Sequence, residues 1–165
     1  MLLSAEKINL KGGYQVTQVK NDTVEFVTDC GVEYVVTFMV DYSIWEENAY
    51  QLVIVNKNRK PSFNDPKLRD TLFFIIEDFF QENKNILLYI CETGDGKQAA
   101  RSKLFIQWFS KYEKAVFFYF KTTEILSEGE ENFAAIILRK DNPELESIVH
   151  DFDEMISILS DKPVE

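Results

Sequence analysis

The sequence predicts an α+β fold in which a single, mostly antiparallel mixed sheet is packed by about three helices. Three observations support this fold class. Apolar residues alternate with a period of two in the first third of the chain, the middle changes to the helical period, and uninterrupted apolar runs typical of central strands follow. With 165 residues the chain is long enough for a substantial core, and residues 1–165 are expected to form one globular domain.

Strands are expected in the first third of the chain, over residues 14–20, 23–28, 33–40 and 50–55. Residues 23–28 show the pattern most clearly, because Val24 and Phe26 occupy one face and Glu25 the other. Asn21-Asp22 before this segment and Asp29-Cys30-Gly31 after it are typical turn sequences. The four segments therefore predict an antiparallel meander with short turns and one longer loop over 43–48.

The middle of the chain changes to helical spacing at Asp65-Pro66. Aspartate can cap a helix, and proline is tolerated at the first helical position. The apolar residues that follow at helical spacing are Leu68, Leu72, Ile75, Ile76 and Phe79, and Phe73, Phe74 and Phe80 widen their stripe. A helix covered on most of its sides is therefore expected up to about residue 80.

The second half of the chain predicts three strands and two helices. The strands are the apolar runs 86–91, 115–120 and 133–138, all three of which are expected to be buried on both faces. One helix is expected over about 97–113. Asn142-Pro143 repeats the cap-and-proline start and opens the last helix, whose apolar stripe consists of Leu145, Ile148, Val149, Phe152, Met155, Ile156 and Leu159.

Composition excludes several classes of protein. A hydrophobic fraction of 45% excludes a disordered chain, and six glycines with two cysteines exclude collagen-like and disulfide-scaffold proteins. Cys30 and Cys91 are each expected to be small, buried or half-buried residues in a reducing compartment. No segment approaches the roughly 18 consecutive apolar residues that a membrane-spanning helix needs. The sequence therefore predicts a soluble, cytoplasmic protein.

Catalytic and metal-binding patterns are sparse. The only histidine, His150, falls opposite the apolar stripe of the last helix and is expected to face solvent. A histidine-based metal site or a Ser-His-Asp triad therefore has little support, and no metal is predicted. Glu128, Glu130 and Glu131 beside Gly129 are expected to form a solvated hairpin loop.

The loop Thr93-Gly94-Asp95-Gly96-Lys97 follows a predicted strand and precedes a predicted helix, which is where phosphate-binding loops occur. It is not a Walker A loop, because Cys91 stands in place of the required earlier glycine and Gln98 follows the lysine. An ordinary turn and a phosphate-binding loop both remain open. Arg101 falls within the apolar stripe of the next helix, so it pairs or stacks inside the protein or contacts an anionic ligand or partner.

Charge is distributed unevenly along the chain. The net charge is -10, which disfavours a broad nucleic-acid-binding surface, yet residues 57–70 and 95–114 each carry +3. If the strands over 50–55 and 86–91 are parallel neighbours, a right-handed crossover brings the loops that follow them to the same edge of the sheet. The residues expected to form an anion-binding crevice there are Arg59, Lys60, Gly94, Gly96, Lys97 and Arg101.

Residues 61–120 resemble an uncharacterised bacterial family of unknown function. The resemblance is carried by Leu88-Tyr89-Ile90-Cys91-Glu92, by Lys97-Gln98-Ala99-Ala100-Arg101, and by Leu104-Phe105 with Trp108-Phe109. It implies a bacterial, intracellular protein and brings no activity or site with it.

The order of the predicted elements also resembles that of the GNAT N-acetyltransferase superfamily, more loosely. In that superfamily antiparallel strands lead to a strand, a pyrophosphate-binding loop and a helix, and then to a further strand and helix. Residues 50–55, 65–80, 86–91 and 97–112 take those places. The loop pattern Q/R-x-x-G-x-G/A is missing, since no glycine lies between Gly31 and Gly94. The resemblance therefore implies a degenerate GNAT-like fold rather than an active acetyltransferase.

Two functions from different classes remain open. The first is a soluble intracellular binding or interaction protein without a complete catalytic constellation, whose partner is an unidentified protein or a small anionic ligand. The alternative is a GNAT-like acyltransferase, or a degenerate relative, that binds acetyl-CoA or another phosphate-bearing ligand. Neither function involves a membrane.

Overall fold

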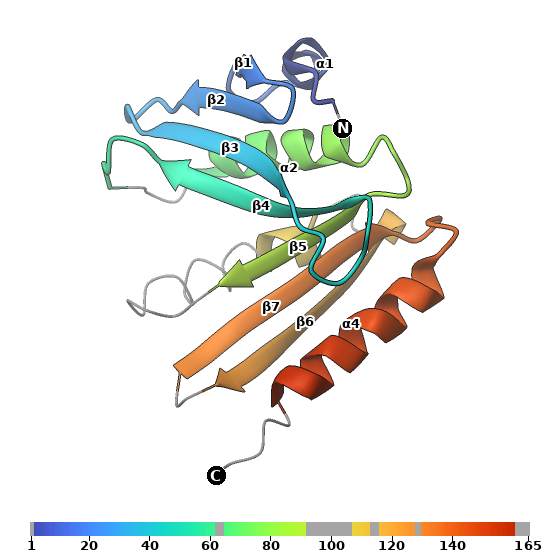
Figure 1. Ribbon diagram of the computed structural model, residues 1–165. Coiled ribbons are helices and arrows are strands. Elements are labelled where there is room, and N and C mark those ends of the chain that lie inside the picture. Colours follow the sequence, from blue (N-terminus) through green and yellow to red (C-terminus); the bar gives the residue numbers. More distant parts are fainter. Residues whose placement is uncertain (1, 62–64, 92–106, 113–115, 128–129, 161–165) are drawn as a thin grey trace. The chain divides into compact units, whose positions relative to one another are not determined.

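The computed structural model describes residues 2–61, 65–91, 107–112, 116–127 and 130–160 (Figure 1). The predicted α+β class is confirmed, because the described strands form a seven-stranded, mostly antiparallel mixed sheet in the order β1-β2-β3-β4-β5-β7-β6. The elements are α1 (Ala5–Leu10), β1 (Thr17–Lys20), β2 (Thr23–Val27), β3 (Glu33–Val40), β4 (Ala49–Asn56), α2 (Pro66–Phe79), β5 (Ile86–Cys91), β6 (Phe118–Ser127), β7 (Glu130–Arg139) and α4 (Leu145–Ser160). Residues 107–110 are also helical.

The chain divides into two compact units. Unit 1 consists of Met1–Met39 and Leu52–Glu82, and unit 2 consists of Val40–Gln51 and Asn83–Glu165. Strand β4 contributes to both, because Ala49–Gln51 belongs to unit 2 and the rest of the strand to unit 1. Each unit is described by itself below.

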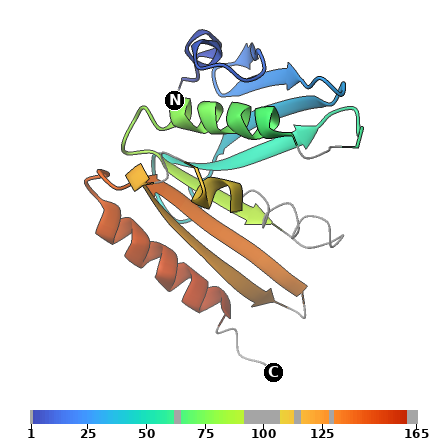
Figure 2. The same cartoon turned by 180° about the vertical axis from the view of Figure 1, so that it is seen from behind.

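In unit 1, helix α2 packs against one face of the sheet (Figures 1 and 2). Strands β2 and β3 are antiparallel, and their register places Val24 opposite Val36 and Phe26 opposite Tyr34 on this face. All four side chains are buried. The rings of Phe38 and Phe79 stack with their centroids 4.3 Å apart, which joins β3 to the apolar stripe of α2. The predicted helical stripe is thus the core-facing surface of α2.

Helix α2 begins where the sequence predicts. Asp65 has extended backbone, and its Oδ1 accepts hydrogen bonds from the backbone N–H groups of Lys67 and Leu68 at 2.9 and 3.3 Å. Pro66 follows at the first helical position, where its missing N–H costs nothing. The Asp-Pro pair therefore fixes the start of this helix through local chemistry.

Helix α1 was not expected from the sequence. It is only six residues long, too short for an apolar period to be recognised. Its N-cap residue Ser4 accepts a hydrogen bond from Lys7 and donates its own N–H to Asp78 Oδ2 at 2.8 Å. The Asn9 amide bonds both backbone groups of Val16. Tertiary contacts within unit 1 therefore stabilise a helix that its own sequence does not predict.

In unit 2, α4 covers one face of the strands. Strand β7 pairs antiparallel with both β5 and β6. The core on the α4 side contains Ala49, Ile86, Leu88, Ala134, Ile136, Leu138, Ile148 and Phe152. An ion pair between Lys121 and Asp153 also joins β6 to α4, and the hydrogen bond to Asp153 raises the pKa of Lys121. Ile148 and Phe152, two members of the predicted stripe, thus place α4 on the sheet.

The opposite face of unit 2 has an aromatic core. Phe109, from the helical residues 107–110, packs its ring 5.7 Å from that of Phe118 and 5.5 Å from that of Phe120. Leu87 and Ile137 are fully buried. The apolar runs that predict β5 and β7 are therefore uninterrupted because both faces of these strands are covered.

Two sequence predictions are wrong, one in each unit. The strand predicted over 115–120 is not doubly buried at its start. Strand β6 begins at Phe118 and is the last strand in the sheet order, and the preceding Val116 and Phe117 are 63% and 65% exposed; residue 115 lies outside the described residues. An apolar run does not show at which residue a strand begins to pair with its neighbour, so the prediction includes exposed residues that precede the strand. Cys30 is exposed rather than buried, because it lies in the turn that Gly31 closes with a positive φ of 79°.

Of the hairpin loop predicted at Glu128, Glu130 and Glu131, the structure describes Glu130 and Glu131, and Glu128 lies outside the described residues. Ser127 pairs with Glu130 and Leu126 with Glu131, so both glutamates belong to β7 rather than to a loop. His150 is exposed, as predicted, with 72% of its side chain accessible and its Nε2 3.9 Å from Glu154 Oε1.

Candidate functional site

The predicted anion crevice lies only partly within the described residues. Arg59 and Lys60 are exposed on the turn that follows β4, where Arg59 has a left-handed φ of 56° and Asn56 Nδ2 donates to the carbonyl of Lys60 at 2.8 Å. Gly94, Gly96, Lys97 and Arg101 lie outside the described residues. The crevice therefore stays a prediction.

The strand order has the arrangement on which that prediction depends. Strands β4 and β5 are parallel neighbours, and their register pairs Ala49 with Ile86 and Gln51 with Leu88. The turn bearing Arg59 and Lys60 thus follows the carboxyl end of one of two parallel strands.

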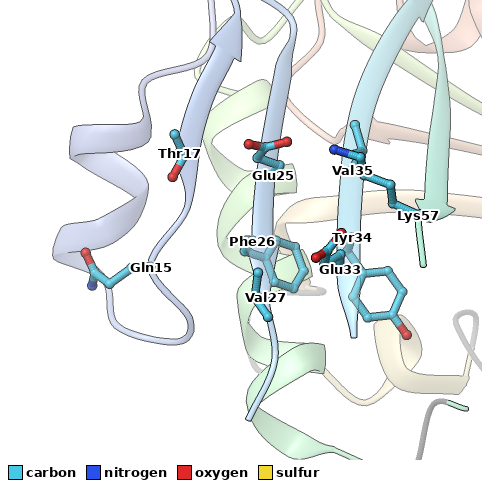
Figure 3. A pocket seen from close by; sticks show the side chains of 9 residues that line it. All are labelled: Gln15, Thr17, Glu25, Phe26, Val27, Glu33, Tyr34, Val35 and Lys57. Carbon is cyan, nitrogen blue, oxygen red and sulfur yellow. The ribbon is translucent and has the colours of Figure 1, made fainter. Parts of the chain in front are cut away.

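A groove of about 400 Å³ lies in unit 1. It is open to solvent on the sheet face opposite the one that packs against α2 (Figure 3). The residues that line it are Gln15, Thr17, Glu25, Phe26, Val27, Glu33, Tyr34, Val35 and Lys57. It combines apolar, hydroxyl, amide and charged side chains on adjacent strands.

The register of β2 and β3 determines the pattern of side chains in the groove. Glu25 is opposite Val35, and Val27 is opposite Glu33. Each carboxylate therefore has one valine across from it on the neighbouring strand and the other valine two residues away on its own strand. Side chains two residues apart share a face of the sheet, so these four lie on the face opposite the buried Val24 and Val36. The groove floor is therefore a checkerboard of two acidic and two apolar side chains.

The rim of the groove is fixed by backbone hydrogen bonds. The N–H of Lys57 donates to the carbonyl of Glu33 at 2.7 Å, and the N–H of Glu33 donates to Asn58 Oδ1 at 3.1 Å. Asn58 in turn donates to the carbonyl of Gly31 at 2.8 Å. Glu33 and Lys57 are thereby held side by side at one end of the groove.

The two groove carboxylates carry uncompensated charge within the described part of the chain. Neither Glu25 nor Glu33 has an ion pair within 4 Å or a side-chain hydrogen bond to another described residue. Lys57 is the one cation among the lining residues, so the lining as a whole is acidic by one charge. Val27, which is 56% exposed, adds apolar surface beside these charges.

The chemistry of the groove is that of a binding surface. Its lining residues carry two hydrogen-bond-accepting carboxylates, one ammonium group, two hydroxyls, one amide and apolar side chains, which are the kinds of group found in binding sites. Among the residues that the structure describes, no group of three or more His, Cys, Asp or Glu side chains is placed to hold a metal ion.

This groove is not among the sites that the sequence predicts, although one of its signals is present in the sequence. The sequence alternates between apolar and polar residues here, which places Glu25 on one face of its strand and Val24 and Phe26 on the other. The pairing of Glu25 with Val35, and of Val27 with Glu33, depends on strand register, which the alternation of one strand does not specify. Lys57 was counted with a basic segment, whereas the structure places it beside an acidic one.

The fold and the groove define this chain as an α+β protein with an uncovered, partly acidic sheet face in one of its units. The sequence matches the Family of unknown function (DUF6169) over residues 64–154, which is more than half of the chain. The chain therefore belongs to this family. The groove residues precede the matched segment.

No curated protein and no solved structure matches this chain. Among the described helices, none combines the length and the apolar character needed to cross a membrane.

Proposed function

We propose that this protein is a binding protein without catalytic activity of its own, and that it acts in the cytoplasm by holding an extended segment of a partner protein in the groove of unit 1. The observation that carries this proposal is the uncovered checkerboard of Glu25, Val27, Glu33 and Val35 on the sheet face opposite α2. The exposed free thiol of Cys30 supports a reducing compartment.

The groove has the size and composition of a recognition site. A volume of about 400 Å³ falls within the range of roughly 300–1,000 Å³ that is common for ligand sites. Burial of an exposed valine stabilises a complex by about 1–2 kcal/mol, so Val27 and Val35 provide affinity while the carboxylates provide selectivity. An extended segment is the occupant that matches a shallow site laid along strands.

The test is an NMR titration of the ¹⁵N-labelled full chain with three ten-residue peptides that differ only in charge: one basic, one neutral and one acidic. We expect saturable shifts of the Val27 and Val35 amides with at least one peptide. Val27→Thr and Val35→Thr should weaken that binding, because threonine keeps the shape and strand preference of valine but is polar.

Val19→Thr is the matched control, since Val19 is an exposed strand valine outside the groove. It should leave the titration unchanged. If all three peptides leave the groove amides unshifted at millimolar concentration, the proposed function is wrong.

A second candidate function is supported by the parallel pairing of β4 and β5. It is a GNAT-like acyltransferase, or a degenerate relative, that binds acetyl-CoA or another phosphate-bearing ligand through Arg59, Lys60, Gly94, Gly96, Lys97 and Arg101. A ligand that binds the folded state alone raises the melting temperature. Thermal shifts with acetyl-CoA, CoA and ATP, compared between the wild-type chain and Arg101→Glu, test this candidate. If millimolar ligand does not raise the melting temperature of the wild type, this candidate is excluded.

A further inference from the structure

We infer that the segment held in the groove is basic, with two cationic side chains at alternate positions of an extended chain, over Glu25 and Glu33. This inference rests on the proposed function and specifies its partner. Three independent features carry it: the spacing of the two carboxylates, their lack of a described partner, and the charge of the rest of the chain.

The spacing of the carboxylates matches an extended peptide. Glu25 is paired with Val35, two residues beyond Glu33, so the two glutamates are diagonal neighbours across β2 and β3. Diagonal neighbours lie about 7–8 Å apart. In an extended chain, side chains at positions i and i+2 are on the same side and about 7 Å apart. A segment with the pattern Lys-x-Lys or Arg-x-Arg therefore places one cation over each carboxylate.

The charge state of the groove favours a cationic occupant. Glu25 and Glu33 are half-buried, and within the described residues neither carboxylate is neutralised by an ion pair. An acidic or phosphorylated segment would bring like charges to these positions, which costs free energy and selects against it. A basic segment also leaves Val27 and Val35 free to contact its aliphatic stems.

The net charge of the whole chain disfavours other occupants. A second copy of this protein carries a net charge of -10 and is repelled at long range, and nucleic acid is repelled for the same reason. A basic protein segment is attracted over the same distance. The attraction weakens as salt shortens the screening length from about 30 Å at 0.01 M to about 8 Å at 0.15 M.

Substitution of Lys57 should change the affinities for basic and acidic peptides in opposite directions. This lysine is the one cation in the lining, and its backbone is bonded to that of Glu33 at the rim. Its ammonium group therefore competes with cations of an incoming segment. Lys57→Gln should tighten the binding of a basic peptide and weaken the binding of an acidic one, an effect that a purely apolar groove would not produce.

The experiment is fluorescence anisotropy of the full chain with labelled ten-residue peptides that are alike except at the charged positions. One carries Lys-x-Lys, one carries adjacent Lys-Lys, and a third carries Glu-x-Glu in their place. We expect Lys-x-Lys to bind most tightly. Glu25→Gln and Glu33→Gln should each weaken it about two- to fivefold, the range for a partly exposed ion pair, and the double variant should weaken it further.

The matched control is the double variant Glu46→Gln and Glu82→Gln, which removes the same net charge from exposed positions outside the groove. It should change the affinity less than twofold at 0.15 M salt. Circular dichroism and melting temperature, measured on every variant, establish that the fold is retained.

The outcomes separate this inference from the proposed function. If the Glu-x-Glu peptide binds the groove as tightly as the Lys-x-Lys peptide, and Val35→Thr weakens its binding, the groove is a binding site but the inferred charge of the partner is wrong. If the basic peptide binds and the control pair weakens it as much as the groove pair does, attraction is general and the specific site is wrong. If none of the peptides binds, both proposals fail.

Discussion

Tyr14 shows how a single polar side chain organises unit 1. It is 5% exposed, its hydroxyl donates to Asp65 Oδ2 at 2.5 Å, and it accepts the N–H of Asp29 at 3.2 Å. Burial, with the hydrogen bond to Asp65, raises the pKa of Tyr14 to about 12. The same Asp65 caps α2, so one carboxylate joins the helix start to the strands.

The Tyr14→Phe variant tests this contact. Loss of a hydrogen bond to a charged group should lower the free energy of unfolding by about 1–2 kcal/mol near neutral pH, measured by urea unfolding. Because the pKa is raised in the folded state, this stabilisation is present below about pH 10 and lost as the pH rises through about 12. The absorbance difference at 295 nm between wild type and variant should therefore titrate near pH 12; a midpoint near 10 would contradict the buried contact.

Asp41 closes the loop between β3 and β4. Its Oδ1 accepts from the Ser43 N–H and hydroxyl at 3.0 and 2.6 Å, and its Oδ2 accepts from Gln51 Nε2 at 2.6 Å. Burial alone would raise the pKa of this carboxyl, but the hydrogen bonds from Ser43 and Gln51 outweigh burial and lower it.

The Asp41→Asn variant should be less stable than wild type by about 1 kcal/mol at neutral pH. The side-chain NH2 group of asparagine is a donor, so it cannot accept the hydrogen bond from Gln51 Nε2. A lowered folded-state pKa provides stability above the unfolded value of about 3.9 and loses it as the pH falls through the folded value. The difference between variant and wild type in urea unfolding should therefore shrink as the pH falls below the unfolded value of about 3.9. Glu46→Gln, on an exposed residue of the same loop, should show no such pH dependence.

At the scale of elements, α4 depends on the few apolar residues that face the sheet. Ile148 is 4% exposed and packs among the strands of unit 2, whereas Ile158 of the same helix is 67% exposed. The two isoleucines thus form a natural pair with the same chemistry and different burial.

Ile148→Ala should lower the free energy of unfolding by about 2–5 kcal/mol, because it removes buried methyl groups and leaves a cavity. Ile158→Ala should change it by less than about 0.5 kcal/mol. Urea unfolding followed by circular dichroism at 222 nm measures both. Equal effects of the two substitutions would show that α4 is not seated on the sheet as described.

Elements with strong local signals could be predicted from the sequence, and those that depend on distant partners could not. The Asp65-Pro66 start and the apolar stripe of α2 are encoded within one segment. Helix α1 could not be predicted because it is short and because residues outside it supply its hydrogen bonds, Val16 from the following loop and Asp78 from α2. The site was missed for the same reason, since its pattern arises only when β2 and β3 are in register.

At the scale of the whole molecule, the sequence predicts one domain, while the structure divides into two compact units. One domain implies a single cooperative unfolding transition. In urea, the NMR signals of Val24 in unit 1 and Ile136 in unit 2 should then disappear at the same midpoint. Ile148→Ala should shift both midpoints together; separate midpoints would show two independently folding parts.

The shared strand β4 restricts how this chain can be divided into fragments. The backbone leaves unit 1 at Met39, supplies residues 40–51 to unit 2, returns for Leu52–Glu82 and then leaves again. No single cut therefore releases either unit intact. A fragment that starts at residue 64, where the family match begins, lacks Ala49–Gln51 and so uncovers the β5 edge to which they pair. Bare edges of this kind attract other strands, so such a fragment should precipitate unless a peptide covering residues 40–56 is supplied with it.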